Sequence, residues 1–324
     1  MLRNALFDAG VFTIVVPSVK SIGVGNLRVG GTGKTPMVEF LLNLINNDAA
    51  VAVLSRGYGR KSSGYLVADA TSTAIDIGDE PAQIKKKFPS VAVAVDGSRV
   101  NGINKLQQSI PELKAIILDD VYQHRHVKPG LMLLLTRYDD LYCDDYLLPV
   151  GMLREPSSNA KRADVIIVTK CPRDMSDVDR DRVKAKLNPE KQQKVLFSRI
   201  GYDIPYNASN KRTGMTTDSV ILVSGIEDPR EFISHAESKY RVRRKFIFKD
   251  HHQFSASDLR SISESMQKFS DAVVLTTEKD WQRLRVGLTD SILDGKRIFI
   301  QPVKTEFIND DQNAIKNIID EYLN

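Results

Sequence analysis

Short runs of apolar residues alternate along this chain with longer segments whose apolar residues recur at helical spacing. Several of the runs are apolar at every position, which is typical of parallel strands buried on both faces of a sheet. Strands that alternate with helices in this way predict a layered α/β fold. We predict strands at 19–24, 51–55, 91–95, 115–118, 131–135, 165–169 and 195–200, and helices at 34–46, 80–88, 98–108 and 177–187.

A polar stretch at 202–218 interrupts this alternation. It carries few apolar residues and several turn formers, as domain boundaries do. We therefore predict a core domain at 1–204, a linker at 205–218 and a smaller α/β domain at 219–324. A last amphipathic helix at 310–323 could pack on either domain. In the smaller domain we predict strands at 220–224, 243–248, 272–276 and 297–300, and helices at 229–239, 256–269 and 278–286.

The first 16 residues are unusually apolar for the start of such a chain. Their apolar side chains cluster at helical spacing, at Leu2, Leu6, Phe7 and Val11. The segment is shorter than the ~20 residues that span a membrane, and it lacks the small-residue cleavage site of a secretory signal. Two interpretations remain open: a helix that covers the sheet, and an interfacial helix that lies on a membrane surface.

Composition narrows the class of protein. The chain has 324 residues, of which 42% are hydrophobic and 27% charged, so it is globular rather than disordered. A net charge of +5 favours anionic partners such as nucleotide phosphates or an anionic membrane surface. No basic tract with interleaved aromatic residues points to nucleic acid. Cys143 and Cys171 lie far apart, which suggests neither a disulfide framework nor a metal site.

A glycine-rich turn follows the first predicted strand and precedes a predicted helix. Such a turn lets backbone N–H groups converge on phosphate oxygens at a helix N-terminus. The usual phosphate-loop pattern begins with a glycine that would fall at Arg28, so the surrounding strand and helix carry the assignment. A glycine-rich turn with a merely solvated lysine is the alternative. The residues that we assign to phosphate and Mg²⁺ are Gly30, Gly31, Thr32, Gly33, Lys34 and Thr35.

Paired carboxylates, Asp119 and Asp120, end an apolar strand downstream of this loop. A carboxylate in that position completes the Mg²⁺ site of phosphate-loop proteins, and two adjacent Asp side chains repel each other unless a cation offsets them. The alternative is a solvated turn with an Asp cap, and we favour the metal site. Nearby, Gln123, His124 and His126 could orient phosphate or substrate.

Other polar clusters also follow predicted strands or sit in nearby loops. Arg56 follows the second strand, Asp96 follows the strand at 91–95, and Arg154 lies in a proline-flanked loop. Ligands of open α/β sheets bind beyond the carboxyl ends of the strands. Each cluster alone could be a turn or a helix cap, but together they mark candidate site residues.

Taken in order, several segments resemble the tetraacyldisaccharide 4′-kinase family, the lipid A kinases of Gram-negative bacteria. The resemblance runs over nearly the whole length. It is carried by SIGVGNLRVGGTGKTP, LSRGYGR, GDEP, LDDVYQHR, LREP, KDHHQFS and TEKD, which begin at residues 21, 54, 78, 118, 153, 249 and 277.

The resemblance implies a core like that of phosphate-loop NTPases, with a second, smaller α/β domain. It implies transfer of the ATP γ-phosphoryl group, with Mg²⁺, to the 4′-hydroxyl of a tetraacylated disaccharide 1-phosphate. It further implies that Glu155 joins the paired Asp residues at the metal. Asp96 and His251 would form the acid–base pair, and Arg56, Gln123, His124 and Arg154 would contact substrate.

The implied location is the cytoplasmic face of the bacterial inner membrane, held peripherally, with the lipid A disaccharide 1-phosphate precursor and an anionic membrane surface as partners. Neither nucleic acid nor an obligate protein partner is implied. The alternative function is a regulatory or metallochaperone-type NTPase with a protein partner. That alternative explains the glycine-rich loop and the paired Asp residues. It leaves Asp96, LREP and the DHH segment unexplained.

Overall fold

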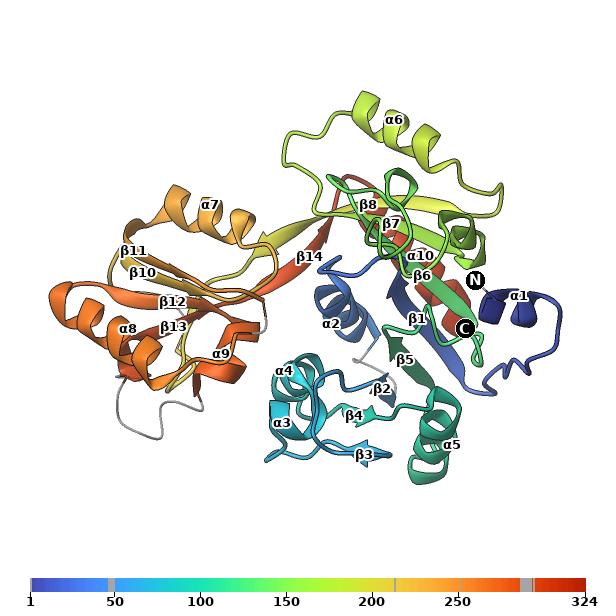
Figure 1. Cartoon of the computed structure of the whole chain (residues 1–324), viewed down its shortest axis with the longest axis horizontal. Coiled ribbons are helices and arrows are strands. Elements are labelled where there is room, and N and C mark those ends of the chain that lie inside the picture. Colours follow the sequence, from blue (N-terminus) through green and yellow to red (C-terminus); the bar gives the residue numbers. More distant parts are fainter. Residues whose placement is uncertain (1, 46–49, 213, 251, 286–292, 294) are drawn as a thin grey trace. The chain divides into compact units, whose positions relative to one another are not determined.

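The computed structural model describes residues 2–45, 50–212, 214–250, 252–285, 293 and 295–324. The chain divides into two compact units, Met1–Gly201 with Lys304–Asn324 (unit 1) and Tyr202–Val303 (unit 2). It passes from unit 1 to unit 2 within strand β8 and returns within strand β14 (Figure 1).

Unit 1 is built on a nine-stranded sheet in the order β14-β8-β7-β6-β1-β5-β2-β4-β3. The strands from β8 to β4 are parallel, and β3 pairs antiparallel at the edge. This confirms the predicted α/β fold. The strands are β1 (Lys20–Asn26), β2 (Val51–Ser55), β3 (Leu66–Val67), β4 (Ala92–Val95), β5 (Ala115–Asp119), β6 (Leu131–Arg137), β7 (Val165–Thr169), β8 (Lys194–Tyr202) and β14 (Val303–Phe307).

Helices cover both faces of this sheet, which is why its central strands are mostly apolar. Side chains of α2, α3, α4 and α10 share one core cluster with alternate strand residues such as Ile117. Those of α5 and α6 share the other cluster with the intervening residues, such as Ile116. The helices are α1 (Leu2–Asp8), α2 (Lys34–Ile45), α3 (Ala74–Ile77), α4 (Asp79–Lys87), α5 (Arg99–Ser109), α6 (Asp177–Leu187) and α10 (Asp311–Leu323), with 3-10 turns η1 (Tyr142–Asp144) and η2 (Ser157–Arg162).

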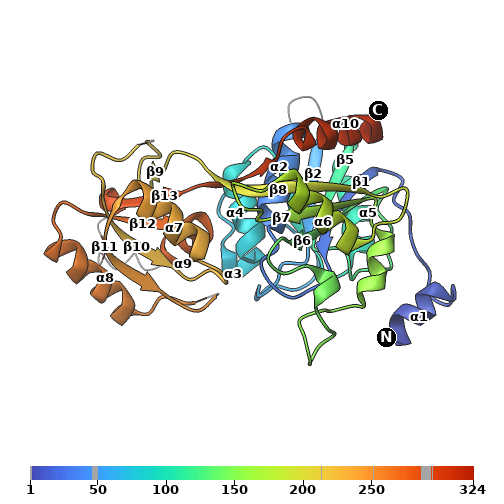
Figure 2. The same cartoon turned by 90° about the horizontal axis from the view of Figure 1, so that it is seen from above.

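The last helix, α10, belongs to unit 1, where it lies along one side of the sheet (Figure 2). Its Ile315 and Ile319 are fully buried in the same cluster as α2. Lys20 Nζ donates to Tyr322 O at 2.8 Å, which fixes the end of the helix beside the start of β1. Segment 304–324 therefore lies in unit 1. The sequence-based boundary groups this segment with the smaller domain but leaves open that its helix at 310–323 packs on the core, which it does.

Unit 2 contains a five-stranded sheet in the order β11-β10-β12-β13-β9. Segment 205–218, which the sequence predicts as a linker, is part of this unit. It contains β9, whose two residues pair antiparallel with β13. The elements are β9 (Tyr206–Asn207), β10 (Ser219–Ser224), β11 (Arg241–Ile247), β12 (Val273–Thr277) and β13 (Ile298–Gln301), with α7 (Arg230–Lys239), α8 (Ala256–Lys268), α9 (Glu278–Leu284) and the 3-10 turn η4 (Gly295–Arg297).

The N-terminal segment packs on the rest of unit 1 through aromatic and polar contacts. Phe7 of α1 is buried, its ring centroid lies 4.8 Å from that of His126, and the guanidinium of Arg125 lies over the Phe7 ring, 5.0 Å from its centroid. Val11 and Val16 remain exposed. Within the described ranges, no helix combines the length and apolar character needed to cross a membrane.

Candidate active site at the carboxyl edge of the unit 1 sheet

The glycine-rich turn connects β1 to α2, as predicted. Asn26, the last residue of β1, donates through Nδ2 to Thr32 Oγ1 at 2.9 Å and to Gly30 O at 3.3 Å. Thr169, at the end of β7, donates to Thr32 O at 2.9 Å. Gly33 has φ +85, a conformation that side chains with a Cβ rarely adopt. Hydrogen bonds from the ends of β1 and β7 thus fix the conformation of the turn, which leads directly into the N-terminus of α2.

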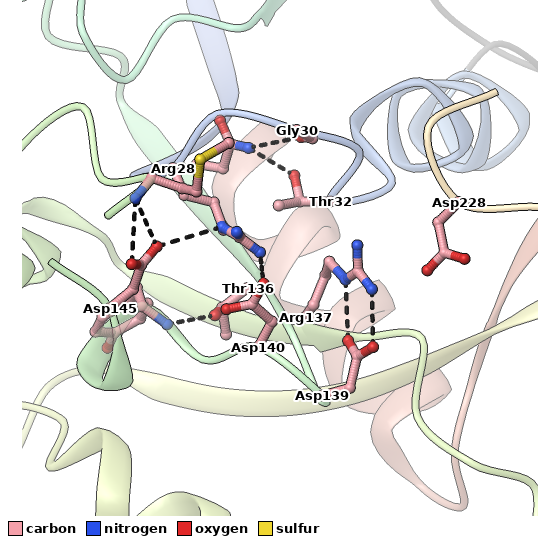
Figure 3. A network of polar contacts seen from close by, with 12 residues as sticks. Arg28, Gly30, Thr32, Thr136, Arg137, Asp139, Asp140, Asp145 and Asp228 are labelled. Carbon is pink, nitrogen blue, oxygen red and sulfur yellow. Dashed lines mark hydrogen bonds and ion pairs between the residues drawn. The ribbon is translucent and has the colours of Figure 1, made fainter. Parts of the chain in front are cut away.

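Arg28 occupies the position where the usual pattern has glycine, and the structure gives it a role that the sequence does not reveal. Its guanidinium forms ion pairs with Asp140 and, through Nε at 3.7 Å, with Asp145 (Figure 3). The backbone beside it pairs with segment 152–154: Val29 N donates to Met152 O at 2.8 Å. Arg28 therefore fastens the phosphate loop to the segment between β6 and β7.

Lys34 lies at the first turn of α2, with its ammonium 3.4 Å from Asp120 Oδ1 and 3.4 Å from Asn26 Oδ1. Arg154 donates to both Asp120 oxygens, at 3.0 and 3.2 Å. Burial raises the pKa of the Asp120 carboxyl, but Lys34 and Arg154 outweigh burial and hold that pKa well below its usual range. Two cations and one ionised carboxylate thus meet beside the phosphate loop.

Asp119 is the buried partner of this pair. Its Oδ2 accepts from Ser55 Oγ at 3.1 Å, whereas its buried Oδ1 has no hydrogen-bond partner among the described residues. Burial, and then the charge of Asp120, raise the pKa of Asp119 to about 6. A buried carboxylate oxygen left without a partner is costly unless a cation completes it. The donor set therefore fits Mg²⁺, which proteins bind with one or two carboxylates and substrate phosphates.

Glu155 is also buried, but its hydrogen bonds are with side chains that do not belong to the phosphate loop. Its Oε2 accepts from Asn4 of α1 at 2.9 Å, from Asn159 at 2.7 Å and from Arg162 at 2.5 Å. Its Oε1 is buried without a partner among the described residues. In that part of the chain, no three His, Cys, Asp or Glu side chains are grouped as a metal site. The assignment of Glu155 and Thr35 to the metal stays a prediction.

Asp96 follows β4 and is nearly fully buried. Its Oδ1 accepts from the backbone N of Ser98 at 2.8 Å, and its Oδ2 accepts from Asn101 Nδ2 at 2.6 Å. Ser98 is also the N-cap of α5, since its side chain accepts from Asn101 N. Two donors therefore fix the orientation of the Asp96 carboxylate at the start of a helix.

Arg99 connects Asp96 to the paired carboxylates, a contact that sequence reasoning missed. This fully buried guanidinium donates to Asp96 O at 2.7 Å and to Asp119 O at 2.9 Å. Burial lowers the pKa of Arg99 to about 10, so the side chain remains charged at neutral pH. It joins the carboxyl ends of β4 and β5 through their main chains. The sequence signal that could have revealed this contact is an arginine at a position of α5 that faces the protein interior, where an apolar residue is expected.

A cavity of about 440 Å³ is lined by Gly97 and Ser98, the two residues that follow Asp96 in the sequence, among others. Burial, and then the charges of Arg99 and Arg56, lower the pKa of His124 to about 4, so its imidazole is neutral at pH 7. The walls come from the N-terminal segment, the start of α5 and the loop after β5. They include Thr13, Val15, Ser98, His124 and His126.

The other predicted substrate residues are placed differently. Gln123 donates through Nε2 to Asn26 O at 2.9 Å, so it contacts the end of β1, just before the phosphate loop. Arg154 contacts Asp120, and Arg56 is exposed. His251 lies outside the described residues, so its pairing with Asp96 stays a prediction. Its neighbour His252 lies in unit 2, with Nε2 3.0 Å from Asp258 Oδ2.

Comparison with known proteins places this geometry in context. The family model described as tetraacyldisaccharide-1-P 4′-kinase matches residues 1–324. Proteins named tetraacyldisaccharide 4′-kinase are similar: one from Flavobacterium johnsoniae is 42% identical, covering 98% of this chain and 92% of its own, and one from Bacteroides fragilis is 40% identical, covering 99% and 89%. A crystal structure of LpxK from Aquifex aeolicus in complex with ATP has a TM-score of 0.76 at 25% identity, covering 100% of this chain and 94% of that one.

Proposed function

Since the chain belongs to the tetraacyldisaccharide-1-P 4′-kinase family, we infer that its phosphate loop holds ATP and that Asp96 accepts the proton of the acceptor hydroxyl. The activity follows from that membership: the chain is a lipid A 4′-kinase, a phosphotransferase that uses ATP and Mg²⁺. A regulatory NTPase with a protein partner is not favoured. The roles of individual residues are the proposal that follows.

The triphosphate would bind where Lys34 and Arg154 now meet Asp120. Backbone amides of the glycine-rich turn and the N-terminus of α2 supply further positive potential there. The residues of the loop are Gly30, Gly31, Thr32 and Gly33, followed by Lys34 and Thr35. Lys34 neutralises negative charge on the transferred phosphoryl group, which needs positioning and charge stabilisation more than covalent chemistry.

Asp119, with Asp120 and Thr35, would hold Mg²⁺, and Glu155 is a further candidate. When bound, the ion neutralises charge on the phosphates. The unpartnered Oδ1 of buried Asp119, 5% exposed at the end of β5, is the single observation that carries this proposal. Ser55 and the main-chain contact of Arg99 keep that carboxylate in place.

Asp96 would act as the general base. Ser98 and Asn101 donate hydrogen bonds that fix the orientation of its carboxylate, and the residues that follow it, from Gly97 to Val100, line the 440 Å³ cavity. A positioned base of this kind contributes about 10²- to 10⁴-fold to the rate. Sequence resemblance adds His251 as its partner. In the same cavity, neutral His124 can donate or accept a hydrogen bond to the sugar.

We place the enzyme peripherally on the cytoplasmic face of the inner membrane. The acceptor carries four acyl chains and stays in a bilayer, so the active site must come to the lipid. The exposed Val11 and Val16 beside α1 and the net charge of +5 suit an anionic membrane surface. Neither nucleic acid nor an obligate protein partner is required for this reaction.

The direct test is to incubate the protein with ATP, Mg²⁺ and the tetraacylated disaccharide 1-phosphate, followed by mass spectrometry for one added phosphate. Lys34→Ala should lower turnover by about 10²- to 10³-fold, because a charge-stabilising group is lost. Asp96→Asn should lower turnover while leaving ATP binding intact. Near-normal turnover by either variant would remove that residue from the mechanism.

A further inference from the structure

Unit 2 contains a buried ion pair that the proposed mechanism does not use. Asp280 and Arg283 lie one turn apart on α9, the helix that follows β12 (Figure 1). Asp280 is 0% and Arg283 is 5% exposed, and Arg283 Nη1 lies 3.7 Å from Asp280 Oδ1. A buried ion pair adds little net stability over apolar residues of the same volume. The contacts of this pair with the surrounding main chain therefore indicate its role.

Asp280 is held at the carboxyl ends of two neighbouring strands of the unit 2 sheet. Its Oδ2 accepts from Thr277 Oγ1 at 2.8 Å and from Ser224 Oγ at 3.3 Å. Thr277 is the last residue of β12, and Ser224 is the last residue of β10. The backbone N of Asp280 also donates to Thr277 Oγ1 at 3.1 Å, which makes Thr277 the N-cap of α9. The first turn of α9 is therefore fixed relative to the sheet.

Arg283 connects this turn of α9 to the segment after β11. It donates through Nη1 to Gly225 O and to His252 O, each at 3.4 Å. Gly225 follows β10, and His252 belongs to segment 248–254, here called the histidine loop. A Cβ at Gly225 would come within 3.3 Å of both Asp280 Oδ1 and Lys249 O, so these segments approach one another closely. One buried guanidinium group thus joins the histidine loop to the end of β10 through main-chain oxygens.

The neighbours of position 251 in the histidine loop are held by helices on both sides. Before it, Asp250 Oδ1 lies 3.5 Å from Lys279 Nζ of α9. After it, His252 Nε2 lies 3.0 Å from Asp258 Oδ2 of α8. Both flanks of position 251 therefore have a defined main-chain path.

We propose that Arg283, itself held by Asp280, is a positioning residue for phosphoryl transfer, because it fixes the main chain that carries His251. This rests on the proposed function, in which His251 acts with Asp96 on the acceptor hydroxyl. Such a side chain must be held closely, since a misplacement of about 1 Å can cost about 10²-fold in rate. Because Arg283 contacts main-chain oxygens at the histidine loop, its effect on the rate passes through His251.

The test is a double-mutant cycle between positions 283 and 251. Arg283→Lys keeps a positive charge beside Asp280, but an ammonium group cannot reach two carbonyl oxygens as the planar guanidinium does. This substitution is made in the wild type and in His251→Ala, and kcat, KM for ATP and the thermal unfolding midpoint are measured for each protein. The matched control is Arg260→Lys, which changes an exposed arginine on α8 of the same unit.

In the wild-type background, Arg283→Lys should lower kcat roughly 10-fold and leave KM for ATP unchanged. In the His251→Ala background it should cause no further loss, because residues that act as one unit have non-additive effects. A general loss of folded protein would instead lower kcat by the same factor in both backgrounds. Arg260→Lys should match its parent in each.

Thr277→Val is a second variant, which leaves Arg283 in place and keeps the proposal testable if Arg283→Lys does not fold. It removes the hydroxyl that donates to Asp280, so α9 holds the ion pair less firmly. We expect a smaller loss of kcat than in Arg283→Lys, again absent from the His251→Ala background.

A folded Arg283→Lys variant with normal kcat would overturn the proposal. An equal loss of kcat in both backgrounds, by either Arg283→Lys or Thr277→Val, would overturn it as well. Failure of the proposed function has a different signature, because His251→Ala alone would then keep near-normal turnover. His251 would in that case leave the mechanism, and the role of Arg283 would fall with it.

Discussion

The pKa of each carboxyl group at this site depends on how far neighbouring positive charges offset the effect of burial. Asp119 and Asp120 are adjacent in sequence, yet the pKa of Asp119 is raised to about 6 while that of Asp120 is lowered. The difference arises because Lys34 and Arg154 both contact Asp120, whereas Asp119 faces Ser55. The pair thus combines a carboxylate fixed by cations with one that is available to a metal ion.

His124 predicts a specific pH dependence of stability. In the unfolded chain a histidine takes up its proton near pH 6.5, but in the folded protein His124 does so only near pH 4. Between these values the unfolded chain binds more protons, so the free energy of unfolding falls as pH decreases from 6.5 towards 4. His124→Asn should weaken this fall, which thermal unfolding across that range would measure.

The control for this experiment is His126→Asn, because His126 is exposed and lies two residues away. It should leave the acid-induced loss of stability as large as in the wild type. An identical pH profile for the His124 variant and the wild type would show that burial does not govern the ionisation of this histidine.

Elements meet at the carboxyl edge of the unit 1 sheet through a few buried polar contacts. Arg99 joins β4 to β5 by donating to Asp96 O and Asp119 O. Because it contacts main-chain carbonyls, it positions both carboxylates without touching the reacting atoms itself. Arg28 has the corresponding role between the phosphate loop and the segment after β6.

Arg99→Met should destabilise the protein by about 2–4 kcal/mol, since two buried carbonyls lose a charged donor. Arg99→Lys keeps the charge but cannot reach both carbonyls as a planar guanidinium does. We expect the Lys variant to fold, with kcat lowered roughly 10- to 100-fold because Asp96 and Asp119 shift relative to each other. KM for ATP should change little.

Arg182→Lys is the matched control, because Arg182 is an exposed arginine of α6 that pairs with Asp179. It should retain wild-type kcat and stability. A folded Arg99→Lys variant with normal kcat would show that joining β4 to β5 contributes to stability alone.

At the scale of the whole molecule, the proposed membrane contact involves the segment after α1. Phe7 anchors this region to unit 1, while Val11 and Val16 stay exposed. We expect Val11→Asp with Val16→Asp to lower co-sedimentation with anionic vesicles and to raise the apparent KM for vesicle-embedded acceptor. KM for ATP should not change, and added salt should weaken wild-type binding without abolishing it.

Val178→Asp provides the control, since it places the same charge on an exposed valine of α6. If the double variant bound vesicles as well as the wild type did, the N-terminal segment would serve to cover unit 1 rather than to contact lipid. The membrane contact would then have to lie on another surface.

Features that depend on the local order of residues could be predicted from the sequence alone. Apolar runs bounded by turns located β1, β2, β5, β6 and β7 to within two residues, because strands buried on both faces are apolar at most positions. The phosphate loop that ends in Lys34 could be predicted despite Arg28, since the strand before it and the helix after it give local sequence signals. The position of the paired carboxylates at the end of a strand could be predicted for the same reason.

Contacts between residues that are distant in the sequence could not be predicted, because the tertiary structure brings them together. The ion pairs of Arg28, the carbonyl contacts of Arg99 and the contact of Glu155 with Asn4 join segments far apart in sequence. No spacing rule encodes such contacts. Short elements were missed as well: β9 has two residues, and β14 is an edge strand whose place depends on β8. These segments are strands because they pair with β13 and β8, and their own residues give no strand pattern.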